Sequence, residues 1–169
     1  MGALVLGMEI AERQRGGEAP AHAGLPSKDL PTSFDAFEMQ DANGALRNSS
    51  EWQGRTLLVN FWATWCAPCR EEIPVFSAVA KTWSERGLVV VGIALDEADA
   101  VRRFGDEIGL DYPSLIAGRD SGYALLERHN PTGALPFSLL VAPDGRIIES
   151  KLGLWHAKDL DTALEKHLP

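Results

Sequence analysis

The pattern of apolar and polar positions divides the chain into an N-terminal leader and a longer body of alternating strands and helices. Residues 9 to about 32 contain three prolines and no periodic apolar positions, so we expect residues 1–30 to form a flexible leader or linker. The folded domain is then expected over residues 31–169. It should open with a β-hairpin over residues 33–47, in which residues 42–44 (ANG) form the turn.

Two apolar runs and the segment between them predict a strand–helix–strand unit. Residues 57–62 and 88–95 are apolar over nearly their whole length, as in strands that are buried on both faces. Between them, residues 67–86 carry apolar residues at helical spacing, and Gly87 suits the end of that helix. Pro74 should bend the helix, because proline lacks the backbone donor. The apolar face of the helix consists of Cys69, Ile73, Phe76, Ala80 and Trp83.

The second half of the chain predicts further helices and an antiparallel strand pair. Asp96 can cap a helix that runs to about residue 108, and another helix is expected at about 121–129. Residues 137–141 and 146–151 are predicted strands joined by a Pro-Asp-Gly turn, and a last helix begins near residue 157. Helices between buried strands imply parallel crossovers, whereas the tight turn implies an antiparallel pair. The fold class is therefore α/β: three layers, α/β/α, with a mixed central sheet and an N-terminal β-hairpin.

Composition and charge limit the classes of function. The chain has 169 residues, 45% of them apolar and 24% charged, which is typical of one soluble globular domain. Its formal net charge of −8 argues against nucleic acid or an anionic lipid surface as a partner. No apolar run of 18 residues is present, and the short apolar start (1–8) lacks a basic region, so we expect no signal peptide in the sequence as written.

The candidate chemistry lies in the only two cysteines, Cys66 and Cys69. Cys66 directly follows a predicted buried strand and stands where the helix begins, and the unpaired N–H groups and the dipole of a helix N-terminus favour a thiolate. Cys69 lies one helical turn further along the same face, so the two sulfurs can close and reopen a disulfide with little backbone movement. Between them, Pro68 suits the first helical turn.

Structural roles for the two cysteines are weaker interpretations. A disulfide that closes so small a loop stabilises the fold by only about 2 kcal/mol, against about 4.7 kcal/mol for a 100-residue loop. A zinc site needs two more ligands, and the four histidines are scattered along the chain without a paired spacing. Redox chemistry is the favoured interpretation, because the C-x-x-C stretch stands between a buried strand and an amphipathic helix.

Two stretches resemble the thioredoxin superfamily, and in particular its TlpA-like branch of bacterial cell-envelope thiol–disulfide reductases of the ResA and CcmG type. The first is residues 59–72 (VNFWATWCAPCREE), and the second is residues 133–141 (GALPFSLLV), followed by Asp144-Gly145 and Gly153. The resemblance covers roughly residues 30–168. It implies a thioredoxin-like fold and a cis peptide bond before Pro136, in a loop that packs opposite the cysteines.

The resemblance also implies roles for individual residues. Thioredoxins carry a buried Asp where this chain has Asn60, whereas in the TlpA-like branch an acid three residues after the second cysteine often transfers the proton, and Glu72 stands there. Burial beside Cys69 would raise the pKa of Glu72 and make it a proton acceptor. The alternative for Glu72 is a solvated position on the helix surface. The expected catalytic residues are Cys66, Cys69, Glu72 and Pro136, and the expected substrate groove is formed by Trp65, Ala67, Pro68 and Leu135.

The function expected from these observations is the reduction of disulfides in partner proteins, with no cofactor besides the Cys66–Cys69 pair. The resemblance implies a periplasmic or cell-envelope location, an anchoring segment absent from this sequence, a membrane electron donor of the DsbD or CcdA type, and a monomer. The alternative is a copper(I) carrier that uses both thiolates. Such a carrier would offer methionine or histidine near the motif, and neither lies within twenty residues of it. A peroxidase of the peroxiredoxin type would need a Pro-x₃-Thr-x₂-Cys setting, which Cys66 lacks.

Overall fold

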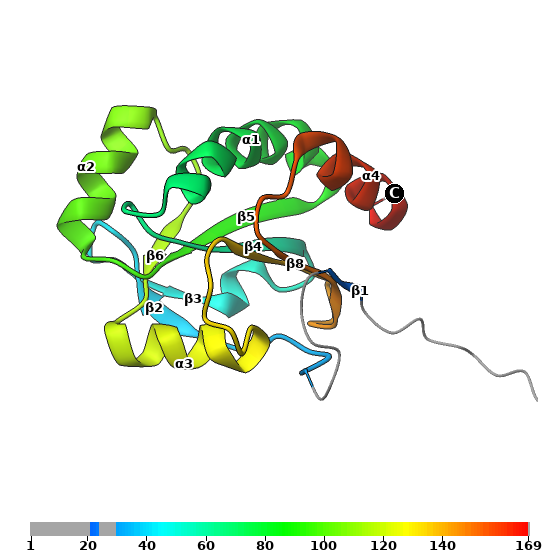
Figure 1. Cartoon of the computed structure of the whole chain (residues 1–169). Helices are drawn as coiled ribbons and strands as arrows, with labels where there is room; N and C mark the ends of the chain where they lie inside the picture. Colours follow the sequence, from blue (N-terminus) through cyan, green and yellow to red (C-terminus); the bar gives the residue numbers. More distant parts are fainter. Residues whose placement is uncertain (1–20, 24–29, 169) are drawn as a thin grey trace, which may run out of the picture.

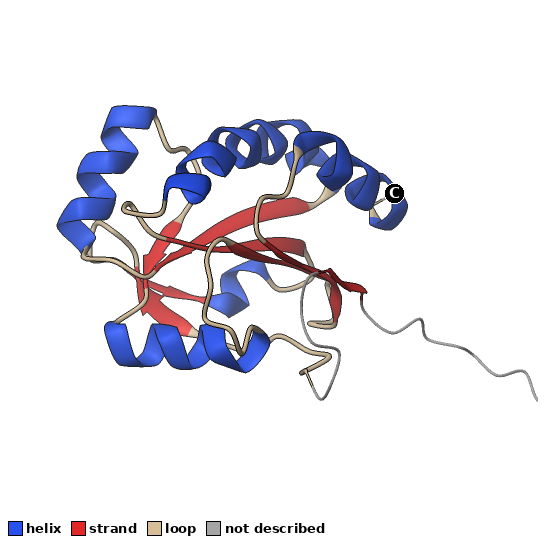
Figure 2. Ribbon diagram, viewed as in Figure 1, coloured by secondary structure: helices blue, strands red, loops and turns tan. Residues whose placement is uncertain are grey.

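A six-stranded mixed sheet with helices on both faces forms the centre of the fold (Figures 1 and 2). A computed structural model of the chain describes residues 21–23 and 30–168. The strand order is β1-β8-β7-β4-β5-β6; β4 pairs in parallel with β5 and antiparallel with β7. The strands are β1 (Ala21–Ala23), β4 (Thr56–Trp62), β5 (Leu88–Ala94), β6 (Ser114–Ile116), β7 (Phe137–Val141) and β8 (Ile147–Leu152).

Among the described residues, helices cover both faces of the sheet (Figure 1), and the α/β fold class expected from the sequence is confirmed. Helices α1, α2 and α4 pack on one face, and α3 lies on the other with the hairpin of β2 and β3. The bounds of these elements are β2 (Glu38–Gln40), β3 (Leu46–Asn48), α1 (Ala67–Trp83), α2 (Ala98–Ile108), α3 (Arg119–His129) and α4 (Ala157–His167), with 3₁₀ turns at η1 (Ser49–Trp52) and η2 (Ser84–Arg86).

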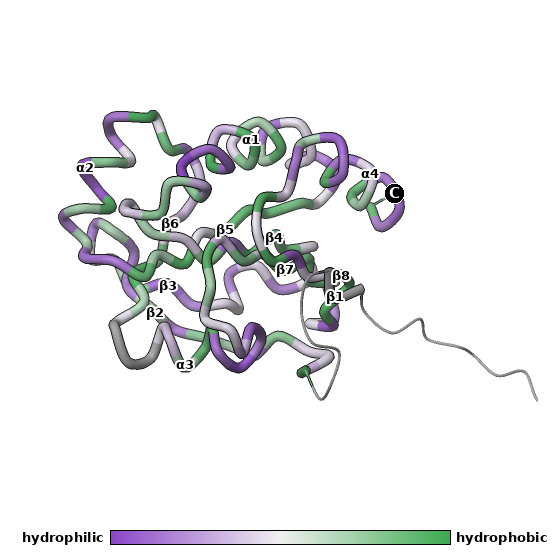
Figure 3. The backbone as a smooth tube through the Cα atoms, viewed as in Figure 1, coloured by the Kyte–Doolittle hydropathy of each residue, from purple (hydrophilic) through white to green (hydrophobic). Residues whose placement is uncertain are grey.

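Alternating side chains of the central strands supply two separate cores. In β4, Leu58 and Trp62 point into the core beneath α1, whereas Leu57, Val59 and Phe61 point into the core on the α3 side. Because side chains alternate along a strand, a strand covered on both faces needs apolar residues at nearly every position. The hydropathy colouring of Figure 3 shows this as green central strands between helices of mixed colour.

Helix α1 begins and ends close to where the sequence predicts. It starts directly after Cys66 and ends at Trp83, and one 3₁₀ turn leads to Gly87, whose φ of 91° is in the left-handed region that glycine tolerates. Pro74 lies inside the helix, on its exposed side. The hairpin of residues 33–47 is also confirmed, but β2 and β3 form a two-stranded sheet of their own.

Three features differ from the sequence-based expectation. The expected leader lies mostly outside the described residues, but Ala21–Ala23 form β1, parallel to β8. The short strand β6, Ser114–Ile116, was not predicted, because three residues are too few to show a pattern. Asp96 does not cap α2: the helix begins after Glu97, and the Asp96 carboxylate binds Thr64 instead.

Candidate active site

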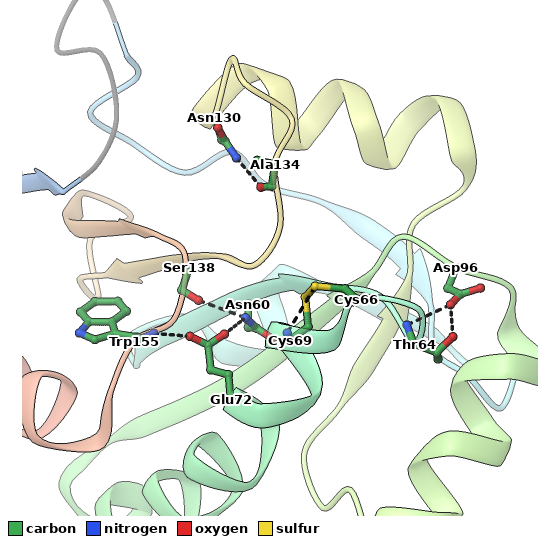
Figure 4. The surroundings of a disulfide bond; sticks show 10 residues. All are labelled: Asn60, Thr64, Cys66, Cys69, Glu72, Asp96, Asn130, Ala134, Ser138 and Trp155. Atoms are coloured by element: carbon green, nitrogen blue, oxygen red, sulfur yellow. Dashed lines mark hydrogen bonds between the residues drawn. A yellow bond between two sulfur atoms is a disulfide. The ribbon is translucent and has the colours of Figure 1, made fainter.

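The two cysteines form a disulfide at the N-terminus of α1, directly after the central strand β4 (Figure 4). Cys66 is the N-cap residue of α1, with an extended backbone, and its Sγ accepts a hydrogen bond from the backbone N–H of Cys69 at 3.3 Å. Cys66 is 6% exposed and Cys69 is fully buried. The donated N–H belongs to the first helical turn, whose donors have no partner within the helix. This arrangement favours a thiolate on Cys66 once the disulfide is reduced.

The loop before Cys66 is held by the carboxylate of Asp96, which lies just after the neighbouring strand β5. One Asp96 oxygen accepts hydrogen bonds from the backbone N–H of Thr64, at 3.0 Å, and from the Thr64 hydroxyl. The other oxygen accepts from the backbone N–H of Glu97 at 2.8 Å. Asp96 follows the end of β5, which pairs with β4 through its last residue, Trp62 opposite Ala94. The position of the cysteine loop is therefore fixed to two strands of the sheet.

Glu72 is buried beneath α1 rather than solvated on its surface. It is 2% exposed, and it lies one helical turn after Cys69 on the same side of the helix. One carboxylate oxygen accepts from the backbone N–H of Trp155 at 2.6 Å, and the other accepts from the Asn60 amide at 3.0 Å (Figure 4). Burial raises the pKa of Glu72 to about 7, although the donors at Trp155 and Asn60 and the charge of Lys151 each oppose this.

Asn60 connects Glu72 to the antiparallel neighbour strand. It is fully buried, and its amide N–H₂ group donates to both Glu72 and the hydroxyl of Ser138, the latter at 3.1 Å. Asn60 and Ser138 stand opposite each other in the pairing of β4 with β7. Among the described residues, none donates a hydrogen bond to the side-chain carbonyl oxygen of Asn60. Near neutral pH, the Glu72 carboxyl group can therefore be either protonated or ionised.

The loop of residues 130–136 approaches the disulfide from β7. The peptide bond between Leu135 and Pro136 is cis, as the family resemblance implies. Pro136 precedes Phe137, which pairs with Phe61 near the end of β4, so the loop lies at the same edge of the sheet as the cysteines. Asn130 closes the loop by donating from its side chain to the carbonyl of Ala134 at 2.8 Å (Figure 4).

The expected groove residues differ in exposure. Trp65 is 65% exposed beside the buried disulfide, and Ala67 and Pro68 are exposed as well. Leu135 is partly buried and packs against both cores. Within residues 21–23 and 30–168, no group of three or more His, Cys, Asp or Glu side chains is placed to hold a metal ion.

Comparison with known proteins identifies the family. Residues 31–158 match the AhpC/TSA family. The chain is 31% identical over 134 residues to the thiol-disulfide oxidoreductase ResA of Bacillus thuringiensis strain Al Hakam, an alignment that covers 79% of this chain and 75% of that protein. The chain belongs to the AhpC/TSA family and is a thiol–disulfide oxidoreductase. ResA of Bacillus subtilis is 28% identical over 132 residues, covering 78% of this chain and 72% of its own length.

Solved structures, including that of a thioredoxin family protein, share the fold of this oxidoreductase. A thiol:disulfide interchange protein of Chlorobium tepidum superposes with a TM-score of 0.73 at 29% identity, covering 85% of this chain and all of that one. StoA of Bacillus subtilis gives a TM-score of 0.63 at 23% identity, covering 79% and 98% of the two chains. The resemblance to the thioredoxin superfamily noted from residues 59–72 and 133–141 is thereby confirmed.

Sequence reasoning found most of the residues that this oxidoreductase gathers around its disulfide, but it missed their polar partners. Asn60 was given no role, and Ser138, Thr64 and the backbone N–H of Trp155 were not considered. Asn60 and Ser138 carried a usable signal, because each is a polar residue within an otherwise apolar strand. Trp155 carried none, since its contribution is a backbone group placed by the loop after β8.

Proposed function

We propose that this oxidoreductase reduces disulfide bonds of partner proteins, with Cys66 as the attacking residue and Cys69 as the resolving one. The observation that supports this most directly is the position of Cys66 as the N-cap of α1, where its sulfur accepts the N–H of Cys69. A helix N-terminus stabilises the thiolate form of a cysteine, so Cys66 is the better nucleophile of the two. The buried sulfur of Cys69, one helical turn further on, is placed to close the disulfide.

The exchange transfers two electrons in two steps. The Cys66 thiolate attacks one sulfur of the substrate disulfide; a mixed disulfide forms, and the other substrate sulfur leaves as a thiolate. The Cys69 thiol then loses its proton, its sulfur attacks Cys66, and the second substrate sulfur leaves. The substrate ends as a dithiol, and the protein ends with the Cys66–Cys69 disulfide. No cofactor takes part in this proposed sequence.

Glu72 is the proposed acceptor of the Cys69 proton. A carboxyl group accepts a proton best when its pKa lies near the working pH, and burial brings the pKa of Glu72 to about 7. Asn60 and the N–H of Trp155 hold the carboxylate in place between transfers. Asn60 and Ser138 are positioning residues in this scheme, because they act through Glu72 rather than on sulfur.

The proposed setting is the bacterial cell envelope, with a membrane electron donor of the DsbD or CcdA type that returns the disulfide to the dithiol. The proposed oligomeric state is a monomer. Over the part of the chain that the structure describes, every helix is too short or too polar to cross a bilayer. The location and the donor rest on the family resemblance.

Trapping of mixed disulfides tests the proposed roles of the two cysteines. In Cys69→Ala, Cys66 should form a stable mixed disulfide with a substrate protein, because no resolving thiol remains. In the matched Cys66→Ala variant, the buried Cys69 should trap little. Non-reducing electrophoresis and mass spectrometry of the cross-linked peptide provide the measurement. Trapping mainly through Cys69 would reverse the assignment.

A further inference from the structure

A hollow of about 480 Å³ lies against the exposed Trp65, the neighbour of Cys66 in the sequence. Trp65, the residue before Cys66, forms one wall. The other walls come from the residues that follow β5, namely Leu95 to Glu97, from Ile116 to Gly118 at the end of β6, and from Tyr123 of α3. Of these lining residues, Trp65 alone also belongs to the substrate groove expected from the sequence.

The lining of the hollow combines aromatic surface with negative charge. Trp65 is 65% exposed, and Tyr123 and Ile116 are partly exposed. Of the described residues that line it, the two that carry charge are Asp96 and Glu97, and both are acidic. The hollow therefore offers apolar faces for an aliphatic chain and carboxylates for a cation.

The two carboxylates differ in how firmly they are placed. Asp96 is half-buried, and both of its oxygens already accept hydrogen bonds from Thr64 and Glu97, so its charge is fixed in position. Glu97 is exposed, and its side chain does not cap α2. It is therefore free to turn toward a ligand in the hollow.

We propose that this hollow binds a lysine or arginine side chain of the substrate protein, one to three residues from the cysteine that Cys66 attacks. This proposal rests on the exchange function proposed above. An extended substrate segment advances about 3.3 Å per residue. When the substrate cysteine is bonded to Cys66, the substrate residues next to that cysteine can therefore reach Trp65 and the hollow beyond it. The aliphatic stem packs against Trp65 and Tyr123, and the cationic head meets Glu97 and the fixed charge of Asp96.

Rates of disulfide reduction for charged model peptides test the proposal. Three peptides with the same intramolecular disulfide carry Lys, Gln or Glu two residues from the attacked cysteine, and the reduced protein is mixed with each in turn. The Lys peptide should be reduced about two- to fivefold faster than the Gln peptide, and the Glu peptide more slowly than either, as an exposed charge pair allows. The Lys preference should weaken in high salt.

Glu97→Gln is the decisive variant, and Glu85→Gln is its matched control. Both remove one exposed carboxylate, but Glu85 lies beyond the far end of α1, which at 17 residues is about 25 Å long. Glu97→Gln should lose at least half of the Lys preference, Glu97→Lys should favour the Glu peptide, and Glu85→Gln should keep the parent preference. Equal rates for all three peptides, or equal effects of Glu97→Gln and Glu85→Gln, would overturn the proposal.

A small uncharged disulfide separates this proposal from the exchange function itself. Bis(2-hydroxyethyl) disulfide does not extend into the hollow, so the parent and Glu97→Gln should reduce it at the same rate. If the parent reduces this compound but shows no peptide preference, the docking proposal fails alone. If the parent reduces neither this compound nor any peptide, the exchange function fails as well.

Discussion

At the scale of single residues, the buried carboxyl of Glu72 stands in an environment very unlike that of a surface side chain. A carboxylate that leaves water is destabilised unless donors replace its hydration, and here two donors do so, the Asn60 amide and the N–H of Trp155. The raised pKa shows that they compensate only in part. The charged form of Glu72 therefore lowers the stability of the fold, which is consistent with a functional reason for its burial.

This cost predicts a pH dependence of stability. The pKa of Glu72 is about 7 in the folded protein against the model-compound value of 4.5, so between those pH values the folded state holds the proton more tightly than the unfolded state. The contribution of Glu72 is therefore fully present below about pH 4.5 and is lost as the pH rises through about 7. The difference corresponds to about 3 kcal/mol.

Glu72→Gln should remove that dependence, because its side chain does not titrate, and the Asn60 amide can turn so that its free carbonyl oxygen accepts from the glutamine. Urea unfolding of the oxidised proteins at pH 4.5 and pH 8 measures this dependence. From pH 4.5 to pH 8, the free energy of unfolding of the variant should rise by about 3 kcal/mol relative to that of the parent. Other titrating groups, such as Glu149, occur in both proteins and cancel. A constant difference between parent and variant would refute the raised pKa. Slower exchange by the variant is also expected above pH 7.

The Thr64 hydroxyl is a second residue whose contribution follows from its partner. It donates to the half-buried Asp96 carboxylate, and hydrogen bonds to charged groups are the stronger class. Thr64→Val should lower the free energy of unfolding by about 1–2 kcal/mol. The matched variant Thr82→Val loses a hydroxyl that donates to a helix carbonyl in an exposed position, and it should change stability by less than about 0.5 kcal/mol. Equal losses in both variants would show that Asp96 does not anchor the loop.

At the scale of elements, the close contact of β5 with its neighbours decides how the strand can be built. Gly92 lies in the middle of β5, opposite Asn60 of β4 and Ser114 of β6. A Cβ atom at Gly92 would lie 2.7 Å from the Ser114 hydroxyl and 2.8 Å from the Trp62 indole nitrogen. Both distances are shorter than van der Waals contact, so the glycine lets the Trp62 ring pass over the strand.

Substitution of Gly92 tests this packing against a second glycine. Gly92→Ala should destabilise the fold by about 1–3 kcal/mol, because Trp62 and Ser114 must move apart. Gly105→Ala in α2 has only ordinary contacts, the nearest at 3.5 Å, and should stabilise the fold by about 0.5–1 kcal/mol because alanine favours the helix. Thermal unfolding of both variants gives the signs. A neutral or stabilising Gly92→Ala would contradict the close approach.

At the scale of the whole molecule, one edge of the sheet gathers every group of the proposed site. The ends of β4 and β5 supply the cysteine loop and Asp96, the start of β7 supplies Pro136, and the loop after β8 supplies the N–H that binds Glu72. Parallel β4 and β5 end at the same edge, where antiparallel β7 begins. The topology therefore brings together segments that are distant in the sequence.

The direction of electron flow depends on the site as a whole, and we expect the protein to act as a reductant. The residues between the cysteines, Ala67 and Pro68, offer no cation that would stabilise the Cys66 thiolate beyond the effect of the helix. Its reduction potential should therefore lie nearer that of thioredoxin, about −270 mV, than that of DsbA, about −120 mV. Equilibration with glutathione buffers measures it, and a potential near −120 mV would make the protein a disulfide donor instead.

Much of the fold could be predicted because the deciding patterns are local. The apolar run of β4, the helical spacing in α1 and the turn before β8 each occupy a few consecutive residues. The short strands β1 and β6 could not be predicted, because their pairing with β8 and β5 depends on where those strands lie. The prediction that Asp96 caps the following helix is wrong for the same reason. Capping involves residues close in the sequence, whereas the observed partner, Thr64, is 32 residues away.

The sequence by itself determined that Cys66 and Cys69 lie close enough to form a disulfide, since a three-residue spacing at the start of a helix brings the two sulfurs together. Only the tertiary structure decided the state of Glu72. Its environment is made by Asn60, 12 residues away, and by Trp155, 83 residues away, and Asn60 in turn binds Ser138, 78 residues away. Burial and hydrogen bonding act through space, so the pKa of this carboxyl depends on the register of β4 with β7 and the course of the loop after β8.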